Sequence, residues 1–152
     1  MSRVARAARV ASRQRVETIT ADKTIQSAET GELYLINYDT GATITVTLPA
    51  MQDGAYFKFL FQAEMDTASA KVKITSSEAV DGDFLGGIFE QVTGGSNANS
   101  AFVTSAPATN HQVTLSHEIQ PGTWIECVCD GTNWILSGCA NVSAVGKVVF
   151  GS

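Results

Sequence analysis

Few residues in this 152-residue chain have side chains suited to acid–base chemistry near neutral pH, because it contains only two histidines. His111 and His117 each lie in or beside a segment of alternating apolar and polar residues. A general acid or base needs titratable groups that converge in a pocket. Nothing in the local pattern gathers carboxylates or hydroxyls around either histidine, so we interpret both as surface or half-buried residues.

The three cysteines could in principle supply a nucleophile, a disulfide or a metal site. A nucleophilic cysteine needs a lowered pKa and a partner histidine, whereas Cys127 and Cys129 lie on an apolar segment. One residue separates them, which is poor geometry for a mutual disulfide and shorter than the usual spacing of zinc ligands. We expect reduced, packed cysteines; the alternative is an intermolecular disulfide through Cys139.

Two glycine-containing motifs could bind ions or phosphate, but both are incomplete. Asp81-Gly82-Asp83 lacks the remaining oxygen ligands of a twelve-residue calcium loop. Gly94-Gly95-Ser96 lacks the lysine and the following helix of a phosphate-binding loop. The sequence therefore predicts no catalytic, cofactor-binding or metal-binding residue, and no enzyme.

The first fifteen residues form a basic arm without an acidic residue. Half of the chain's ten basic residues lie there: Arg3, Arg6, Arg9, Arg13 and Arg15. The remainder carries a formal charge of −10, so the arm and the body form an electrostatic dipole. The arm could neutralise phosphates, but it lacks aromatic residues for base stacking and the acidic body would repel nucleic acid. We favour a protein partner, with the arm either helical or extended when bound.

From Val16 onward the pattern changes to short alternating runs separated by turn residues, which is typical of a β-sandwich. We predict strands at Leu33–Tyr38, Ala42–Pro49, Tyr56–Phe61, Lys71–Thr75, His111–Leu115, Trp124–Cys129 and Trp134–Ser137. Phe57, Phe59 and Phe61 share one face of a strand that we place at the centre of the core. The expected architecture is an antiparallel sandwich over residues 16–152, preceded by the arm over residues 1–15. No apolar run is long enough for a membrane-spanning helix.

The clearest hairpin runs from Trp124 to Cys139, with Asp130-Gly131-Thr132-Asn133 as its turn. Pairing Asp130 with Asn133 places one set of side chains on one face: Ile125, Cys127, Cys129, Trp134 and Leu136. The other face carries Trp124, Val128, Ile135 and Cys139. A hairpin that is apolar on both faces needs two partners, and another subunit can be one of them. We therefore predict Trp124, Val128 and Ile135 as oligomer-interface residues.

The stretch from Ala79 to Pro107 is rich in glycine, serine and asparagine. The apolar residues that we interpret as its anchors are Phe84, Leu85, Ile88, Phe89 and Val92. Long loops inside compact domains are usually functional or disordered. We predict a long surface excursion that contacts another subunit.

Several segments together resemble a recurring β domain of tailed bacteriophages, found in tail fibres and in capsid decoration (cement) proteins. The resemblance covers about residues 28–139 and is carried by the segments Gly41–Ala50, Gly54–Phe59, Val72–Ile74, Gly122–Trp124 and Cys129–Gly138. Its most specific element is the turn Asp130-Gly131-Thr132-Asn133-Trp134. The resemblance implies a jelly-roll-like sandwich, a trimer and no catalytic residues.

A fibre subunit normally carries long repeats or a coiled-coil shaft, and neither occurs in this chain. We therefore expect a trimeric decoration protein on the capsid surface of a virion, assembled in the host cytoplasm. Its partners would be two copies of itself and the major capsid protein, without a cofactor. The alternatives are a tail-fibre or receptor-binding module, and a carbohydrate-binding sandwich that would place Trp124 or Tyr56 in a polar groove.

Overall fold

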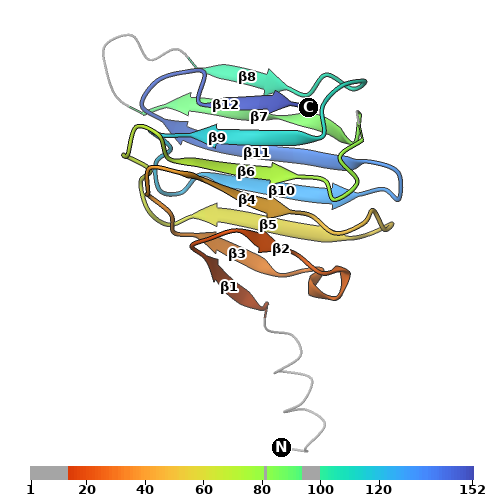
Figure 1. Ribbon diagram of the computed structural model, residues 1–152. Coiled ribbons are helices and arrows are strands. Elements are labelled where there is room, and N and C mark those ends of the chain that lie inside the picture. The colour runs from red at the N-terminus through yellow and green to blue at the C-terminus, as the bar shows by residue number, and fades with distance from the viewer. Residues whose placement is uncertain (1–13, 81, 94–99) are drawn as a thin grey trace, which may run out of the picture.

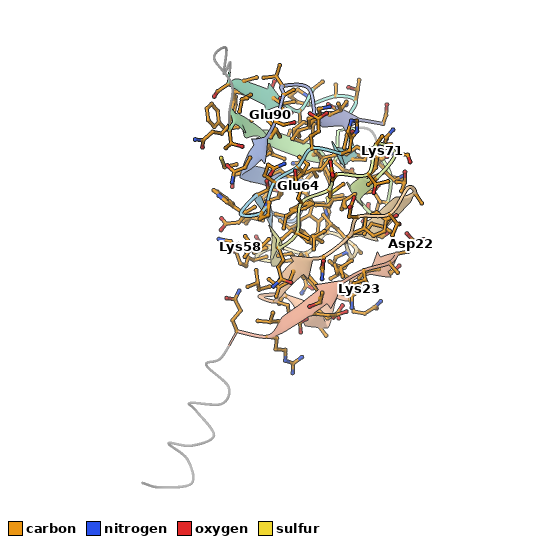
Figure 2. All side chains as sticks on the ribbon, turned by 90° about the vertical axis from the view of Figure 1, so that its left-hand side faces the viewer. Asp22, Lys23, Lys58, Glu64, Lys71 and Glu90 are labelled. Carbon is orange, nitrogen blue, oxygen red and sulfur yellow. The ribbon has the colours of Figure 1, made fainter. Side chains whose placement is uncertain are left out.

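The computed structural model describes residues 14–80, 82–93 and 100–152, which form an all-β sandwich of two sheets (Figure 1). The seven-stranded sheet has the order β1-β3-β5-β10-β11-β7-β8, and the five-stranded sheet has the order β12-β9-β6-β4-β2. Figure 2 separates the two layers, with Lys58 of the larger sheet and Lys71 of the smaller one on opposite sides of the molecule.

The strands of the seven-stranded sheet are β1 (Val16–Ile19), β3 (Leu33–Ile36), β5 (Tyr56–Phe61), β7 (Phe84–Val92), β8 (Ala101–Thr104), β10 (Trp124–Cys129) and β11 (Trp134–Val142). The strands of the five-stranded sheet are β2 (Lys23–Thr24), β4 (Thr43–Thr47), β6 (Lys71–Thr75), β9 (Gln112–Ser116) and β12 (Val148–Gly151). The single helical element in the described part of the chain is a 3₁₀ turn, Ser27–Glu29. No described helix has the length and apolarity that a bilayer crossing requires.

Alternation of apolar and polar residues builds the core between the sheets. On β5, Phe57, Phe59 and Phe61 are fully buried, as expected for a central strand. The facing sheet contributes inward side chains from β4, β6 and β9, among them Val46 and Ile74. The prediction of an all-β sandwich is confirmed, because the two sheets pack face to face over a shared core of buried apolar side chains.

The expectation of purely antiparallel pairing is wrong. From β1 to β7 the chain passes from one sheet to the other with every successive strand. In this part of the chain, two strands that lie side by side in one sheet are separated along the sequence by a strand of the other sheet. Four such pairs are parallel: β1-β3, β3-β5, β2-β4 and β4-β6. A parallel pair needs a crossover, and here the opposite sheet supplies it. The jelly-roll-like connection stays a prediction.

The prediction of a long surface excursion from Ala79 to Pro107 is also wrong. This segment contains β7, which pairs in parallel with β11 along its whole length, and β8, which pairs with β7. Gly86 makes the pairing possible, because its φ is +94°, in the left-handed region, and a Cβ atom there would lie 2.1 Å from the Leu136 carbonyl oxygen. Gly86 and Gly87, which lie in the stretch predicted as a surface excursion, are thus part of a strand.

A buried carboxylate joins the two sheets near the C-terminus. Glu90 on β7 is 1% exposed and accepts hydrogen bonds from the backbone N–H groups of Gly146, Lys147 and Val148 at 2.8, 2.7 and 2.6 Å. These residues lead into β12 of the other sheet. Glu90 therefore clamps β12 against the larger sheet, and sequence reasoning had not singled it out.

Candidate functional site

His117 belongs to an ion-pair network around Glu118. His117 Nε2 lies 3.4 Å from Glu118 Oε1, and the same carboxylate contacts Lys147 Nζ at 3.1 Å and accepts a hydrogen bond from the Ser143 hydroxyl. The Ser143 hydroxyl, followed by Lys147, lowers the pKa of Glu118. At neutral pH Glu118 is a stabilised anion in an ion-pair network, which makes it a poor proton acceptor.

The cysteines lie where the hairpin register predicts. Cys129 pairs with Trp134 and Cys127 with Leu136, and both cysteines are buried and free. Burial raises the pKa of the Cys127 thiol far above its ordinary value, so the reactive thiolate is not populated at neutral pH. Cys139 points to the outer face of the sheet and is half-buried.

An acidic cluster occupies the end of the sandwich near β1. Carboxylate oxygens of Glu17, Glu29 and Glu32 lie within 4.8 Å of one another. Lys23 Nζ lies between two of them, 3.0 Å from Glu17 and 2.9 Å from Glu29. Burial opposes the charge of Lys23, but its hydrogen bonds to Glu29 and Glu17 outweigh this effect and raise its pKa. An ammonium group therefore already fills this cluster.

Arg15 is the one arm arginine that falls within the described residues, and its guanidinium lies 3.3 Å from Glu32. It connects the end of the arm to the same acidic cluster. Four other predicted partner-binding residues lie outside the described residues: Arg3, Arg6, Arg9 and Arg13. Their proposed role stays a prediction.

The most unusual surface is the outer face of the seven-stranded sheet, which we call the apolar face. One register row crosses all seven strands: Thr18, Leu35, Leu60, Trp124, Cys139, Phe89 and Phe102. A second row crosses four strands: Tyr56, Val128, Ile135 and Leu85. Phe102 is 64% exposed and Ile135 is 42% exposed. Two rows of aliphatic and aromatic side chains thus face outward.

Glycine again shapes this surface. A Cβ atom on Gly87 would lie 2.8 Å from the Phe102 ring, so the absence of a side chain at Gly87 leaves room for that ring on the sheet. Phe89 is the register partner of Phe102 and points the same way. The two rings extend the apolar face to the edge strand β8.

Between the two apolar rows lies a row with a single ion pair. Lys58 Nζ and Glu126 Oε1 are 2.8 Å apart, and Lys58 also lies 5.1 Å from the centre of the Trp124 ring. The hydrogen bond to Glu126 raises the pKa of Lys58, and the bond from Lys58 lowers that of Glu126. Among the strand residues of this face that the structure describes, these two are the charged ones, and their charges cancel.

The opposite outer surface, which we call the polar face, has a different composition. Its outward strand residues are Thr24, Thr43, Thr45, Thr47, Lys71, Lys73, Thr75, Gln112, Thr114, Ser116, Val149 and Gly151. Val149 is its single large apolar residue among those described. A surface of threonines, lysines and amides is well suited to water.

The apolar face contains all three residues that the hairpin pattern predicts for an interface. Trp124, Val128 and Ile135 lie together on it, beside Cys139. Sequence reasoning missed Phe89 and Phe102, because they belong to the stretch interpreted as a loop. The local sequence carries no alternation that marks Phe89 as outward, because Ile88 beside it is also apolar and the inward neighbour Glu90 is charged.

Comparison with protein-family models, with curated proteins and with solved structures finds no match.

Proposed function

We propose that this chain is a non-enzymatic structural protein of a tailed-bacteriophage virion, a trimeric decoration (cement) protein on the capsid surface. The observation that carries the proposal is the contrast between the two outer faces. One face of the sandwich is suited to water, while the other presents two rows of apolar side chains across its strands. Apolar surface of this extent on a small domain is typical of a protein that works in an assembly.

The side chains that could do chemistry support a structural role. Within the described residues, His117 and Glu118 belong to an ion-pair network, and Cys127 is buried with a raised pKa. The acidic cluster already holds Lys23. The phage assignment itself rests on the resemblance of the strand and turn segments, above all Asp130-Gly131-Thr132-Asn133-Trp134.

The proposed mechanism is thermodynamic. A trimer that binds several subunits of the major capsid protein only in the mature lattice stabilises that lattice by mass action. Three linked attachment points convert modest contacts into tight binding, because the second and third contacts are intramolecular. The basic arm offers such a contact, since it begins at the Arg15 end of the sandwich and carries four further arginines.

The carbohydrate-binding alternative has less support from the surface. Trp124 lies between Leu60 and Cys139 in the apolar row, with Lys58 over its ring, and Tyr56 neighbours Val128. Sugar sites combine an aromatic ring with several hydrogen-bonding groups. The surroundings of both rings are dominated by apolar side chains instead of such groups.

Heating empty phage shells with and without the purified protein tests the proposal. We expect the protein to co-sediment with shells in fixed stoichiometry and to raise the temperature at which they rupture. A variant lacking residues 1–13, which keeps Arg15 and its ion pair with Glu32, should remain folded and bind shells more weakly. Equal rupture temperatures with and without the protein would refute the proposal, and binding on a glycan array would favour the receptor-binding or carbohydrate-binding alternatives.

A further inference from the structure

We infer that the apolar face is covered by copies of this same chain, and that the capsid protein binds elsewhere on the subunit. The inference deepens the proposed function, because it names the partner of the surface on which that proposal rests. It follows from the size, the charge and the chemistry of the face.

The size of the face matches what a stable protein–protein contact needs. Seven strands about 4.8 Å apart span about 29 Å, and three outward rows along the strands span about 20 Å. The whole outer face, including the middle row that holds Lys58 and Glu126, therefore covers roughly 600 Å², compared with the ~800 Å² that each partner contributes to a standard interface. One copy of this chain therefore offers nearly the area that another copy requires.

The charge on the face also favours a copy of the chain. Residues 16–152 carry a formal charge of −10, so two bodies that approach by arbitrary surfaces repel each other. On the apolar face the charges of Lys58 and Glu126 cancel within one subunit at 2.8 Å. Copies of the chain can therefore meet through this face around a shared axis without bringing like charges together.

The chemistry of the face is complementary to itself. Apolar contact is non-directional, so the leucine, isoleucine, valine and aromatic side chains of one copy can pack against those of its two neighbours around a threefold axis. Aromatic residues are enriched at the centres of interfaces. Trp124 lies in the middle of the row that crosses all seven strands, directly beside Cys139, and Phe89 follows on the next strand.

Cys139 provides a direct probe of this arrangement, because it lies on the apolar face whereas Cys127 and Cys129 are buried. We would measure the molecular mass of the isolated protein and the rate at which a maleimide labels Cys139. The matched control moves the thiol to the polar face in a Cys139→Ser, Thr114→Cys variant. We expect an oligomer in which Cys139 reacts at least about tenfold more slowly than the cysteine at position 114, at the same protein concentration.

The other outcomes separate this inference from the proposed function. A monomer with a reactive Cys139 that becomes protected only on shells would overturn the inference and the trimeric state, and leave binding to the capsid surface standing. An oligomer in which Cys139 reacts as fast as the control thiol would also overturn it, because the copies would then meet by another surface. A protected Cys139 in a protein that does not stabilise shells would support the inference and remove the decoration role.

Discussion

The two outer faces of this sandwich are built by the same strand geometry and yet differ in chemistry. On β9 the outward residues are Gln112, Thr114 and Ser116, whereas on β11 they include Ile135 and Cys139. The inner faces of both strands are buried and apolar. Folding alone requires only one apolar face per sheet. The second apolar face of the larger sheet therefore needs an explanation outside the single subunit, and assembly supplies one.

The largest effect that we predict is on assembly. It is tested by introducing the same negative charge on the apolar face in one variant and on the polar face in another. Ile135→Glu puts a carboxylate in the second row of the apolar face, where burial against another copy leaves it unpaired and desolvated. We expect association to weaken by at least about 100-fold, equivalent to about 2.8 kcal/mol, because the burial of an unpaired charge costs several kcal/mol. Light scattering coupled to size exclusion would measure the mass.

Thr114→Glu is the matched control for that variant. It introduces the same side chain on an interior strand of the five-stranded sheet, on the polar face. The mass should not change, and circular dichroism should show that both variants are folded. Dissociation caused equally by the two substitutions would contradict the assignment of the apolar face as the interface.

The second prediction compares neighbouring residues on β11. Leu136 is buried in the core, and Ile135 points outward on the same strand. Leu136→Ala removes core contacts and leaves a cavity, so it should lower the free energy of unfolding of the subunit by about 2–5 kcal/mol. Ile135→Ala should change subunit unfolding much less and act mainly on association. Denaturant titrations at low and high protein concentration would separate the two effects.

The sequence predicts the faces of strands better than their partners. Alternation located β5, β6 and β10 with the observed bounds, and the Asp130–Asn133 turn placed the β10–β11 register correctly. It also placed Trp124 and Ile135 on a second apolar face. Period-two alternation reports which side chains share a face, but it carries no information about which strand lies alongside. The parallel pairs of β1, β3 and β5 were therefore missed.

Glycine caused the other error in the sequence-based prediction. Gly86 and Gly87 contributed to the glycine-rich composition that predicted a surface excursion. In the structure each glycine allows a close approach: Gly86 to the Leu136 carbonyl and Gly87 to the Phe102 ring. Both neighbours are distant in sequence, so their proximity could not be anticipated. Both residues of the apolar row beyond Cys139, Phe89 and Phe102, lie in this segment.

The third prediction concerns the clamp between the two layers. Glu90→Gln replaces a carboxylate that accepts three backbone hydrogen bonds with an amide that has one acceptor oxygen. At least one buried N–H loses its partner, so we expect a loss of about 1–3 kcal/mol in the free energy of unfolding. Neither outer face changes, and the mass should stay that of the wild type when the variant is folded. Gln91→Ala, on the outward side of the same strand, is the control and should leave unfolding nearly unchanged.

The smallest effect concerns the ion pair at the centre of the apolar face. The hydrogen bond from Lys58 lowers the pKa of Glu126. The ionised Glu126 side chain therefore stabilises the fold at pH values above the ordinary carboxyl pKa, and this stabilisation is lost as the pH falls through the lowered pKa of Glu126. The pKa of Lys58 is raised, so its contribution is present below the ordinary lysine pKa and is lost as the pH rises through the raised one. The ion pair should therefore stabilise the fold across the neutral pH range, and its contribution to the free energy of unfolding should be lost first at acidic pH.

For the dissociated subunit this contribution should be below about 1 kcal/mol, because both side chains are partly exposed to solvent. A double-mutant cycle with Lys58→Met and Glu126→Gln, measured by denaturant unfolding at neutral and acidic pH, gives the coupling directly. In the oligomer the same pair would be shielded from water, and breaking it by Glu126→Gln alone would leave an unpaired ammonium group in the interface. The coupling measured in the oligomer should thus exceed that in the dissociated subunit. Equal coupling in both states would mean that the pair remains in water after association, which would contradict burial of the apolar face.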